Sequence, residues 1–412
     1  MTKTVLISGA GIAGPALAYW LRRQGFTPAI VEVAPGPRPG GQTVDLRGIS
    51  KLVAERMGLM PQIAAQQLHE RGLEYVRASG RTAAAMPAEL LDGAGPVADV
   101  EILRGDLAQI LHDATTDDVE YLYGDSIAAL DEDATGVLIT FTSGTRRRFD
   151  LVVGADGVHS RVRRLAFGPE EQFVQHLGGY TSYFSVEAPE PLNHWMKIYS
   201  APGGRWVGLR PDHDPGVAKA LLSFRSPVIS YDRRDLDAQK ALLAERFAGL
   251  GWHTERILAG LRDADDFYFD STSRVVVPKW SRGRVVLVGD AGYCGSPLAG
   301  HGTALSLVGA YVLAGELAVA DGDHSRAFPA YQARMQAYVD QRMELPPGGI
   351  TMAMPMTALG IRLRDTSIRL TMSRLFAGLL AKLAVAKPDA IQLPDYSVER
   401  GDPVGIAAEE AE

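Results

Sequence analysis

The chain has 412 residues, and its 42 Lys and Arg face 49 Asp and Glu, which gives a formal net charge of −7. This length predicts two to three domains or one large α/β enzyme. Apolar residues make up 46% and charged residues 22%, values that exclude wholesale disorder, collagen-like repeats and coiled coil. The acidic balance argues against binding to nucleic acid.

Cysteine and histidine usage limits the chemistry further. Cys294 is the only cysteine, so an intramolecular disulfide and a cysteine-rich metal site are excluded. The nine histidines show no metal-ligand spacing, and we expect no metal site. We therefore predict a reducing, cytoplasmic compartment. The chain starts without a signal-like segment, and the most apolar helix, Pro297 to Val319, is expected to be buried in a soluble protein rather than to span a membrane.

The first elements form a β-α-β unit within about 30 residues. A short apolar run over 4–8 is followed by a helical pattern over 15–24, and a second β-rich run covers 27–33. Such a unit predicts a parallel sheet with a crossover helix. The next predicted elements are a Gly- and Pro-rich loop over 34–48, helices over 50–69, a hairpin over 73–87, a helix over 103–113, and strands over 119–123, 137–142 and 148–153.

The composition of the sequence changes near residue 172. Aromatic and β-branched residues recur over 172–225 and predict a mostly antiparallel sheet. Further along, the patterns predict a helix over 234–248, strands over 266–277 and 284–289, and helices from 297 onward. The acidic tail after about 398 is expected to be frayed.

A glycine motif joins the first strand to the first helix. Gly9, Gly11 and Gly14 stand as GxGxxG, with Ile12 and Ala13 between them. In such a motif the first glycine allows the tight turn, the second lets a pyrophosphate approach the backbone, and the third lets helix and strand pack closely. Phosphates then lie at the helix N-terminus. The sequence predicts a dinucleotide site, with Glu32 at the end of the second strand binding ribose hydroxyls beside Val33.

Two later stretches distinguish between dinucleotides. Residues 152–163 resemble the GADG-x-x-S-x-V-R segment of class A flavoprotein monooxygenases, and residues 284–292 resemble the second flavin signature of that family, with its GD pair at Gly289 and Asp290. The segment from Pro297 to Gly302 matches the family's P-x-x-G-x-G helix entry. The chain thus resembles FAD-dependent aromatic hydroxylases of the para-hydroxybenzoate hydroxylase fold over about residues 1–345.

The resemblance implies a set of cofactor contacts. Asp290 would accept hydrogen bonds from ribityl hydroxyls, and the backbone at the entry to the following helix would stabilise negative charge on the flavin. Arg104 would hold the phosphate and ribityl region, with a plain surface arginine as the alternative. Asp156 would bridge the cofactor and NAD(P)H phosphates, or serve only as a structural turn. The remaining residues that we assign to cofactor binding are Gly289, Pro297, Gly300, Gly302 and Thr303.

The loop over 40–48 resembles a segment of tetracycline-inactivating and antibiotic-tailoring monooxygenases. Glycines there would allow the flavin ring to approach, and Asp45 and Arg47 would contact the flavin or NAD(P)H; a solvated loop is the alternative. The sequence departs from the family at Gly292, where the pattern has GDAAH, and at Ala304 and Gly309, where Asn and Asp are common.

The expected fold is α/β, with a GxGxxG Rossmann-like FAD domain, an inserted antiparallel-sheet substrate domain and a helical C-terminal segment. The predicted boundaries are 1–72, 97–170 and 268–345 for the FAD domain, 73–96 and 171–267 for the substrate domain, 346–398 for the C-terminal helices and 399–412 for the tail. Apolar spacing at Leu363, Ile368, Leu370, Leu375, Leu379, Leu380 and Leu383 would cap the site or form a dimer face.

Aromatic residues of the second predicted sheet suggest the substrate site. Tyr183, Trp195 and Trp206, with Arg210, would form a wall over the flavin that suits a flat aromatic or polycyclic molecule, although core packing also explains such aromatics. No catalytic residue is assigned, because the chemistry belongs to the flavin; Arg47 and Arg210 are the candidates.

The resemblance implies a monooxygenase that uses FAD, NADPH or NADH, and O2. A flavin C4a-hydroperoxide would insert one oxygen atom into an aromatic, polyketide-like or antibiotic substrate. The alternatives are a flavin-dependent reductase or oxidative cyclase, and a non-catalytic flavin-binding protein. A halogenase is disfavoured, because the W-x-W-x-I-P motif is absent. The expected partner is a small molecule, and the chain would be a monomer or a homodimer.

Overall fold

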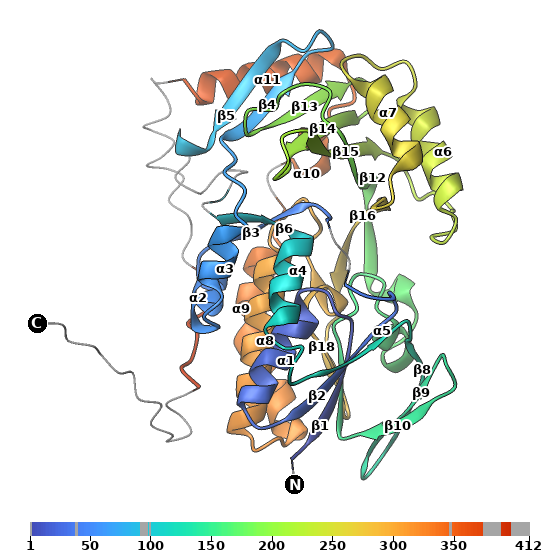
Figure 1. Ribbon diagram of the computed structural model, residues 1–412, viewed down its shortest axis with the longest axis vertical. Helices are drawn as coiled ribbons and strands as arrows, with labels where there is room; N and C mark the ends of the chain where they lie inside the picture. The colour runs from blue at the N-terminus through green and yellow to red at the C-terminus, as the bar shows by residue number, and fades with distance from the viewer. Residues whose placement is uncertain are drawn as a thin grey trace, which may run out of the picture.

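The structure is a computed structural model that describes residues 2–37, 40–90, 98, 100–345, 348–373 and 389–396. Of the predicted C-terminal helices over 346–398, α10 (Gly349–Ala353) and α11 (Ala358–Thr371) fall within this range. The leucines at 375, 379, 380 and 383 and the tail over 399–412 lie outside the described residues. In Figure 1 the molecule is elongated, with helices stacked beside one sheet at the N-terminal end and a second, larger sheet at the opposite end.

A six-stranded sheet is built around the N-terminal strand. β1 pairs in parallel with β2 on one side and with β11 on the other, and only the edge strand β17 runs antiparallel. Val5, Leu6 and Ile7 of β1 are fully buried, as expected for the central strand of a parallel sheet that is covered on both faces. The strands in sheet order are β17 (Ser281–Arg282), β18 (Val285–Leu287), β11 (Leu151–Gly154), β1 (Thr4–Ser8), β2 (Thr27–Glu32) and β7 (Glu120–Tyr123).

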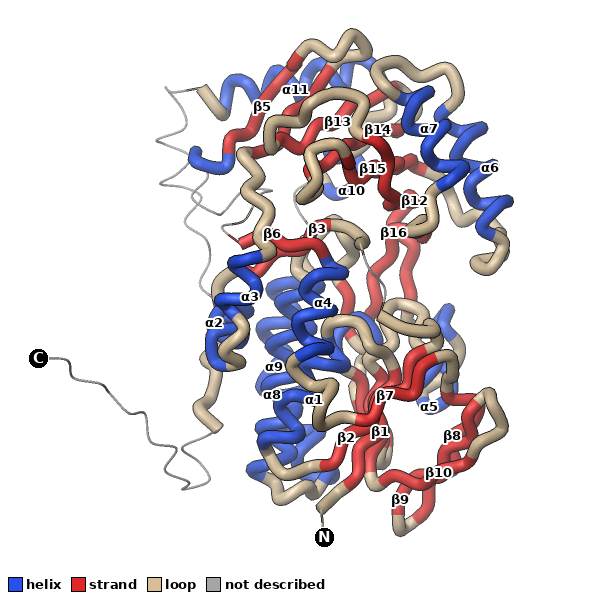
Figure 2. Tube along the Cα trace, in the orientation of Figure 1, coloured by secondary structure: helices blue, strands red, loops and turns tan. Residues whose placement is uncertain are grey.

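Helices α1 (Ala13–Arg23), α8 (Gly302–Val319) and α9 (His324–Arg342) pack together on one side of this sheet, as Figures 1 and 2 show. α8 is long and apolar enough to cross a membrane by length and composition, but 89% of it is buried inside the molecule, as in a core helix. The helix begins at Gly302 rather than at Pro297, because the five residues before it form a loop.

The other side carries α5 (Arg161–Ala166) and a three-stranded antiparallel meander, which contributes to the same hydrophobic core. Its strands are β8 (Ile127–Asp133), β9 (Gly136–Phe141) and β10 (Arg146–Phe149).

The Gly- and Pro-rich segment over 34–48 was expected to be irregular throughout, and this expectation is wrong for its second half. β3 (Thr43–Leu46) pairs antiparallel with β6 (Val100–Leu103). The partner strand lies more than 50 residues further along the chain, so no local pattern indicates the pairing. The resulting ribbon leads directly into α4 (Arg104–Asp113), and it lies between the two large sheets in Figure 1.

The second large sheet has eight strands and matches the predicted antiparallel region, including the hairpin over 73–87. All neighbours pair antiparallel except β13 and β4. The strands in sheet order are β19 (Tyr293–Cys294), β16 (Tyr268–Val276), β12 (Val174–Glu187), β15 (Val217–Arg225), β14 (Arg205–Pro211), β13 (Trp195–Ala201), β4 (Gly72–Val76) and β5 (Thr82–Pro87).

Helices α6 (Leu236–Phe247) and α7 (Thr254–Asp263) cover one face of the eight-stranded sheet and form a second core with it, in which Phe224 and Phe247 are fully buried. The sequence predicted α6 but not α7. The remaining helical elements are α2 (Ile49–Arg56), α3 (Met60–Ala65), η1 (Ala88–Leu90), η2 (Glu170–Gln172) and η3 (Gly289–Ala291).

Two long strands, β12 and β16, connect the two ends of the molecule (Figure 1). The predicted division assigns residues 268–345 to the FAD-binding part, whereas β16 pairs with β12 inside the eight-stranded sheet. The opposite face of this sheet carries α10 and α11 and also faces the β3–β6 ribbon and the loop before α8, and the candidate site lies there.

Candidate functional site

The glycine motif forms a tight turn with no room for side chains. A Cβ atom on Gly9, whose φ is +108°, would lie 2.5 Å from the Ala155 carbonyl oxygen, and one on Gly14 would lie 1.9 Å from the Gly9 carbonyl oxygen. These distances explain the first and third glycines by close packing of strand and helix. Ile12 and Ala13 are buried at the start of α1.

Glu32 is fixed at the end of β2. Its two carboxylate oxygens each accept a backbone N–H at 2.9 Å, from Ala10 and from Ala34. Val33 beside it is 64% exposed. Tyr123 stands opposite Glu32 in β7, and its buried hydroxyl has no hydrogen-bond partner among the described residues. Sequence reasoning missed Tyr123, because its position follows only from the pairing of β2 with β7.

A cation and a carboxylate face the motif from other elements. The Arg104 side chain, at the start of α4, reaches the second glycine, since a Cβ on Gly11 would lie 3.1 Å from Arg104 Nη2. Asp290 is half-buried, and its Oδ1 atom is buried without a hydrogen-bond partner among the described residues. Burial raises the pKa of Asp290, although the Cys294 thiol and Arg104 act in the opposite direction.

These features fit the cofactor implied by the sequence. A side-chain-free turn with an arginine over it suits a pyrophosphate, because the first N–H groups of α1 and the guanidinium both attract an anion. A buried carboxylate oxygen without a partner suits a ribityl hydroxyl, since such an oxygen costs free energy until a donor reaches it. The residues present therefore fit FAD.

The loop before α8 forms a rim beside Asp290. A Cβ on Gly302 would lie 3.6 Å from Asp290 Oδ1, and the N–H groups of the first turn of α8, with Thr303 buried in it, have no partner within the helix. Gly300 and Gly289 have positive φ angles of +71° and +61°, which favour glycine. Pro297 holds the other end of the rim and lines a cavity.

Strand β3 of the β3–β6 ribbon and the residues directly after it lie close to this rim. Arg47 pairs with Asp45 at 2.8 Å. Burial, Arg342 and Arg47 together lower the pKa of His301 to about 4, so the imidazole between these cations is neutral at pH 7. Arg47 is thus near the start of α8, as the sequence interpretation requires.

Asp156 has a structural task in this arrangement. Its Oδ2 accepts the backbone N–H groups of Arg161 and Val162 at 2.8 and 3.1 Å, and its Oδ1 accepts the Ser160 hydroxyl at 2.5 Å. The carboxylate thus binds the free N–H groups at the start of α5. This matches the structural alternative that the sequence left open, and a direct cofactor contact stays a prediction.

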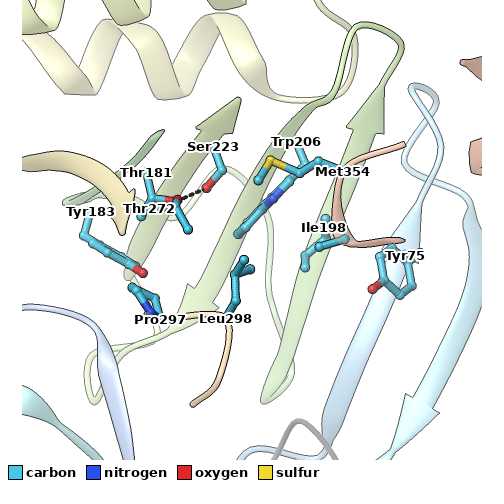
Figure 3. A pocket seen from close by; sticks show the side chains of 11 residues that line it. Tyr75, Thr181, Tyr183, Ile198, Trp206, Ser223, Thr272, Pro297, Leu298 and Met354 are labelled. Atoms are coloured by element: carbon cyan, nitrogen blue, oxygen red, sulfur yellow. Dashed lines mark hydrogen bonds between the residues drawn. The ribbon is translucent and has the colours of Figure 1, made fainter. Parts of the chain in front are cut away.

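A cavity of about 200 Å³ lies under the eight-stranded sheet (Figure 3). Tyr183 and Trp206 line it from β12 and β14, and Pro297 and Leu298 face them from the rim before α8. Met354, which follows α10, closes one side. Two of the predicted substrate residues therefore share a cavity with the predicted flavin rim.

Trp195 requires a correction, because it does not line this cavity. Ile198 of the same strand does, and residues three apart in a regular strand lie on opposite faces. The Trp195 ring instead packs against Gly72, where a Cβ would lie 2.7 Å from its Cζ3, and beside the Arg71 guanidinium at 5.6 Å.

Arg210 lies on the cavity face of β14, four residues beyond Trp206, but two carboxylates hold it. Its Nε donates to Glu70 at 2.6 Å and its Nη2 donates to Glu101 at 3.0 Å. Burial raises the pKa of the cavity residue Tyr183 to about 12, although the charge of Arg210 acts in the opposite direction. The sequence did not indicate either glutamate, because residues 70, 101 and 210 come together only in the tertiary structure.

His159 forms a second charged cluster, with Asp270 and Glu170. Its Nε2 lies 2.7 Å from an Asp270 oxygen, and its Nδ1 lies 3.1 Å from a Glu170 oxygen. The pKa of His159 is raised, because hydrogen bonds to these carboxylates outweigh the larger single effect of burial. The cluster ties the segment before α5 to β16, where Tyr268 also donates to Asp270 at 3.0 Å.

Comparison with known proteins identifies the family. A family model described as an FAD binding domain matches residues 2–344. A flavin-dependent monooxygenase of Legionella longbeachae is 41% identical over 337 residues, which cover 82% of this chain and 86% of that protein. The chain belongs to the class A FAD-dependent monooxygenases. An uncharacterised protein of Mycobacterium tuberculosis is 44% identical over 353 residues, covering 84% of this flavoprotein and 94% of its relative.

Solved structures agree with this assignment. The flavoprotein matches the tetracycline destructase Tet(51) with a TM-score of 0.78 and 34% identity, over 96% of this chain and 100% of that one. It also shares its fold with HpxO of Klebsiella pneumoniae, solved with FAD and uric acid, at a TM-score of 0.72 and 22% identity over 94% and 97% of the two chains. The resemblance drawn from the three sequence signatures, the α/β fold and the binding of FAD are thereby confirmed.

Proposed function

We propose that this protein is a cytoplasmic, NAD(P)H-driven monooxygenase that inserts one oxygen atom from O2 into an aromatic or polyketide-like substrate. The observation that carries the proposal is the single cavity shared by Tyr183 and Trp206 of the large sheet and by Pro297 and Leu298 of the rim. An aromatic wall opposite the rim suits a flat ring held over the cofactor.

The chain's own residues would divide the work as follows. Arg104 and the backbone at Gly11 would hold the pyrophosphate, Glu32 the ribose, and Asp290 a ribityl hydroxyl. The N–H groups at the start of α8 would stabilise negative charge on the ring. Asp45 and Arg47 would meet the ring or the nicotinamide cofactor. When bound, FAD supplies the redox chemistry, taking electrons from NAD(P)H and activating O2.

One or two rings of the substrate would enter the cavity. The cavity volume of about 200 Å³ is below the roughly 300 Å³ at which pockets begin to enclose drug-sized ligands. We therefore propose that the cavity takes the reacting ring and that the rest of a larger scaffold lies outside it. The 34% identity to a tetracycline destructase supports a polycyclic substrate.

The test uses the purified holoprotein. We expect a yellow protein that releases FAD on denaturation and oxidises NADPH or NADH with uptake of O2, faster when a suitable aromatic or polycyclic compound is added. Mass spectrometry under ¹⁸O2 should then find one labelled oxygen atom in the product. Turnover without O2 would favour a reductase or cyclase, and bound FAD without turnover would favour a binding protein. Stimulation by compact phenols alone would contradict the polycyclic substrate.

A further inference from the structure

Arg210 is the only arginine that the sequence assigns to the substrate site, and its charge is already engaged. The side chains of Glu70 and Glu101, which accept its Nε–H and Nη2–H, are 0% and 1% exposed, whereas Arg210 itself is 12% exposed. Both bonds use the side of the guanidinium that would otherwise bind a carboxylate in a bidentate manner. Among the described residues, Nη1 has no hydrogen-bond partner, and it is not one of the fully buried atoms.

In this triad of Glu70, Glu101 and Arg210, the two glutamates offset the charge of the arginine. Burial raises the pKa of Glu101 to about 8, with a further increase from Glu70 and Asp45 and a decrease from Arg210. The raised pKa favours the neutral form of Glu101. Glu101 Oε1 accepts two N–H groups, from Arg210 at 3.0 Å and from Ala98 at 3.2 Å, and its buried Oε2 has no hydrogen-bond partner among the described residues.

The cations beside the triad are themselves paired with carboxylates. The charged and titratable groups that face it are Asp45 from β3, Tyr183 from β12 and, paired with Arg210 in the sheet register, Lys219 from β15. Lys219 is itself engaged by Asp212 at 3.1 Å and by Asp266 at 3.5 Å. Arg47, the cation that pairs with Asp45 at 2.8 Å, is likewise engaged by a carboxylate.

We propose that Glu70 and Glu101 mask the charge of Arg210, so that the sheet face beyond the cavity offers an N–H donor without net positive charge and selects a neutral substrate oxygen, such as a carbonyl, amide or phenol, over a carboxylate. The inference rests on the proposed function, because Arg210 is not among the residues that line the cavity and meets the substrate only where the substrate extends beyond the cavity along the same face of β14. An anion at Nη1 would gain the attraction of the guanidinium but also meet the repulsion of the Glu70 carboxylate, whereas a neutral oxygen accepts the same N–H without that repulsion.

The test compares two ligands of the same shape, naphthalene-2-carboxamide and naphthalene-2-carboxylate. Binding to the FAD-loaded protein is followed by the shift in flavin absorbance at pH 7 and pH 9. The wild type should bind the amide more tightly, by about tenfold at pH 7 and more at pH 9, where Glu101 ionises. Glu70→Gln should raise carboxylate affinity about tenfold at pH 7 and change amide affinity less than about twofold. Glu101→Gln should act like the wild type at pH 7 and bind the carboxylate more tightly than the wild type at pH 9.

Glu74→Gln is the matched control, because Glu74 lies on β4 beside the cavity residue Tyr75 and therefore points to the other face of the sheet. If Glu70→Gln does not fold, the comparison of Glu101→Gln with the wild type at the two pH values decides. Equal affinities for the two ligands in the wild type, or an unchanged preference in the variants, would overturn the masking while leaving the proposed function intact. If neither ligand shifts the flavin spectrum of a protein that retains FAD, both the masking and the assignment of the cavity are overturned.

Discussion

The cofactor end of this site is formed mainly by backbone, whereas the substrate end is formed mainly by side chains. At the glycine motif the backbone forms the site, and a Cβ at Gly9 or Gly14 would collide with carbonyl oxygens. Under the large sheet, side chains from several strands form the cavity wall. Charge differs as well, since Asp290 keeps an oxygen without a partner among the described residues whereas two carboxylates hold Arg210.

This difference separates affinity from selectivity. A buried carboxylate oxygen without a partner and a turn free of side chains are both stabilised when the cofactor binds. The cofactor end is therefore specific for one ligand. A compensated arginine and aromatic side chains contribute shape and neutral hydrogen bonds, which can be changed by substitution without unfolding the dinucleotide-binding end. Variants of each end should therefore affect different measurements.

The largest effect is expected at the glycine turn. Gly11→Val should weaken FAD binding by at least about a hundredfold, because the new side chain occupies the approach of the pyrophosphate and pushes against Arg104. FAD titration of the apoprotein, with circular dichroism to confirm folding, measures this. Gly36→Ala is the control, since nothing lies within 4 Å of a Cβ there. Retention of FAD in Gly11→Val would show that the turn is not a phosphate site.

Asp290→Asn should weaken FAD binding about ten- to hundredfold, the value of one charge-assisted hydrogen bond. The apoprotein should melt no lower than the wild type, because burial raises the pKa of Asp290 and the substitution removes a buried acid that lacks a partner at Oδ1. Asp323→Asn is the control, since Asp323 caps α9 and should affect melting without changing FAD affinity. Equal FAD binding by wild type and Asp290→Asn would make Asp290 structural only.

The two tryptophans of neighbouring strands sharpen the comparison at the substrate end. Trp206→Ala should weaken binding of an aromatic ligand about tenfold or more, because the ring lines the cavity, and should leave FAD content unchanged. Trp195→Ala should cost stability through its contact with Gly72 but leave ligand affinity within about twofold. Flavin absorbance titrations test both. A larger ligand defect in Trp195→Ala would reverse the assignment of faces.

The smallest effect is expected for the cluster of His159 with Asp270 and Glu170. The pKa of His159 is raised in the folded protein, so its contribution to stability is full below the ordinary value near 6.5 and is lost as the pH rises through the raised pKa. His159→Gln should therefore lower the free energy of unfolding by about 1 kcal/mol at pH 6 and by less above the raised pKa.

Unfolding curves over a pH series measure this difference. His213→Gln is the control and should have a smaller effect, because the pair of His213 and Asp106 is more exposed to water. A loss of stability in His159→Gln that does not change with pH would mean that packing alone explains the role of His159.

The sequence by itself determined the cofactor end. Gly9, Gly11, Gly14, Glu32 and Asp290 could be assigned to it because each would act through its own backbone or at the end of the strand that it follows, and such local requirements leave a pattern in the order of residues. The same holds for the parallel order of β1 and β2 and for the buried helix α8. The three ordered signatures were sufficient for the family.

Only the tertiary structure decided the substrate end. The pairing of β3 with β6, the opposite faces of Trp195 and Trp206, and the meeting of Glu70 and Glu101 with Arg210 depend on strand register and on contacts between residues 54 to 140 positions apart. A strand pattern shows which residues alternate between the two faces of a sheet but not which face is covered, because that depends on where α6 and α7 pack. Burial also raises the pKa of Glu101, and no local sequence pattern encodes burial of that kind.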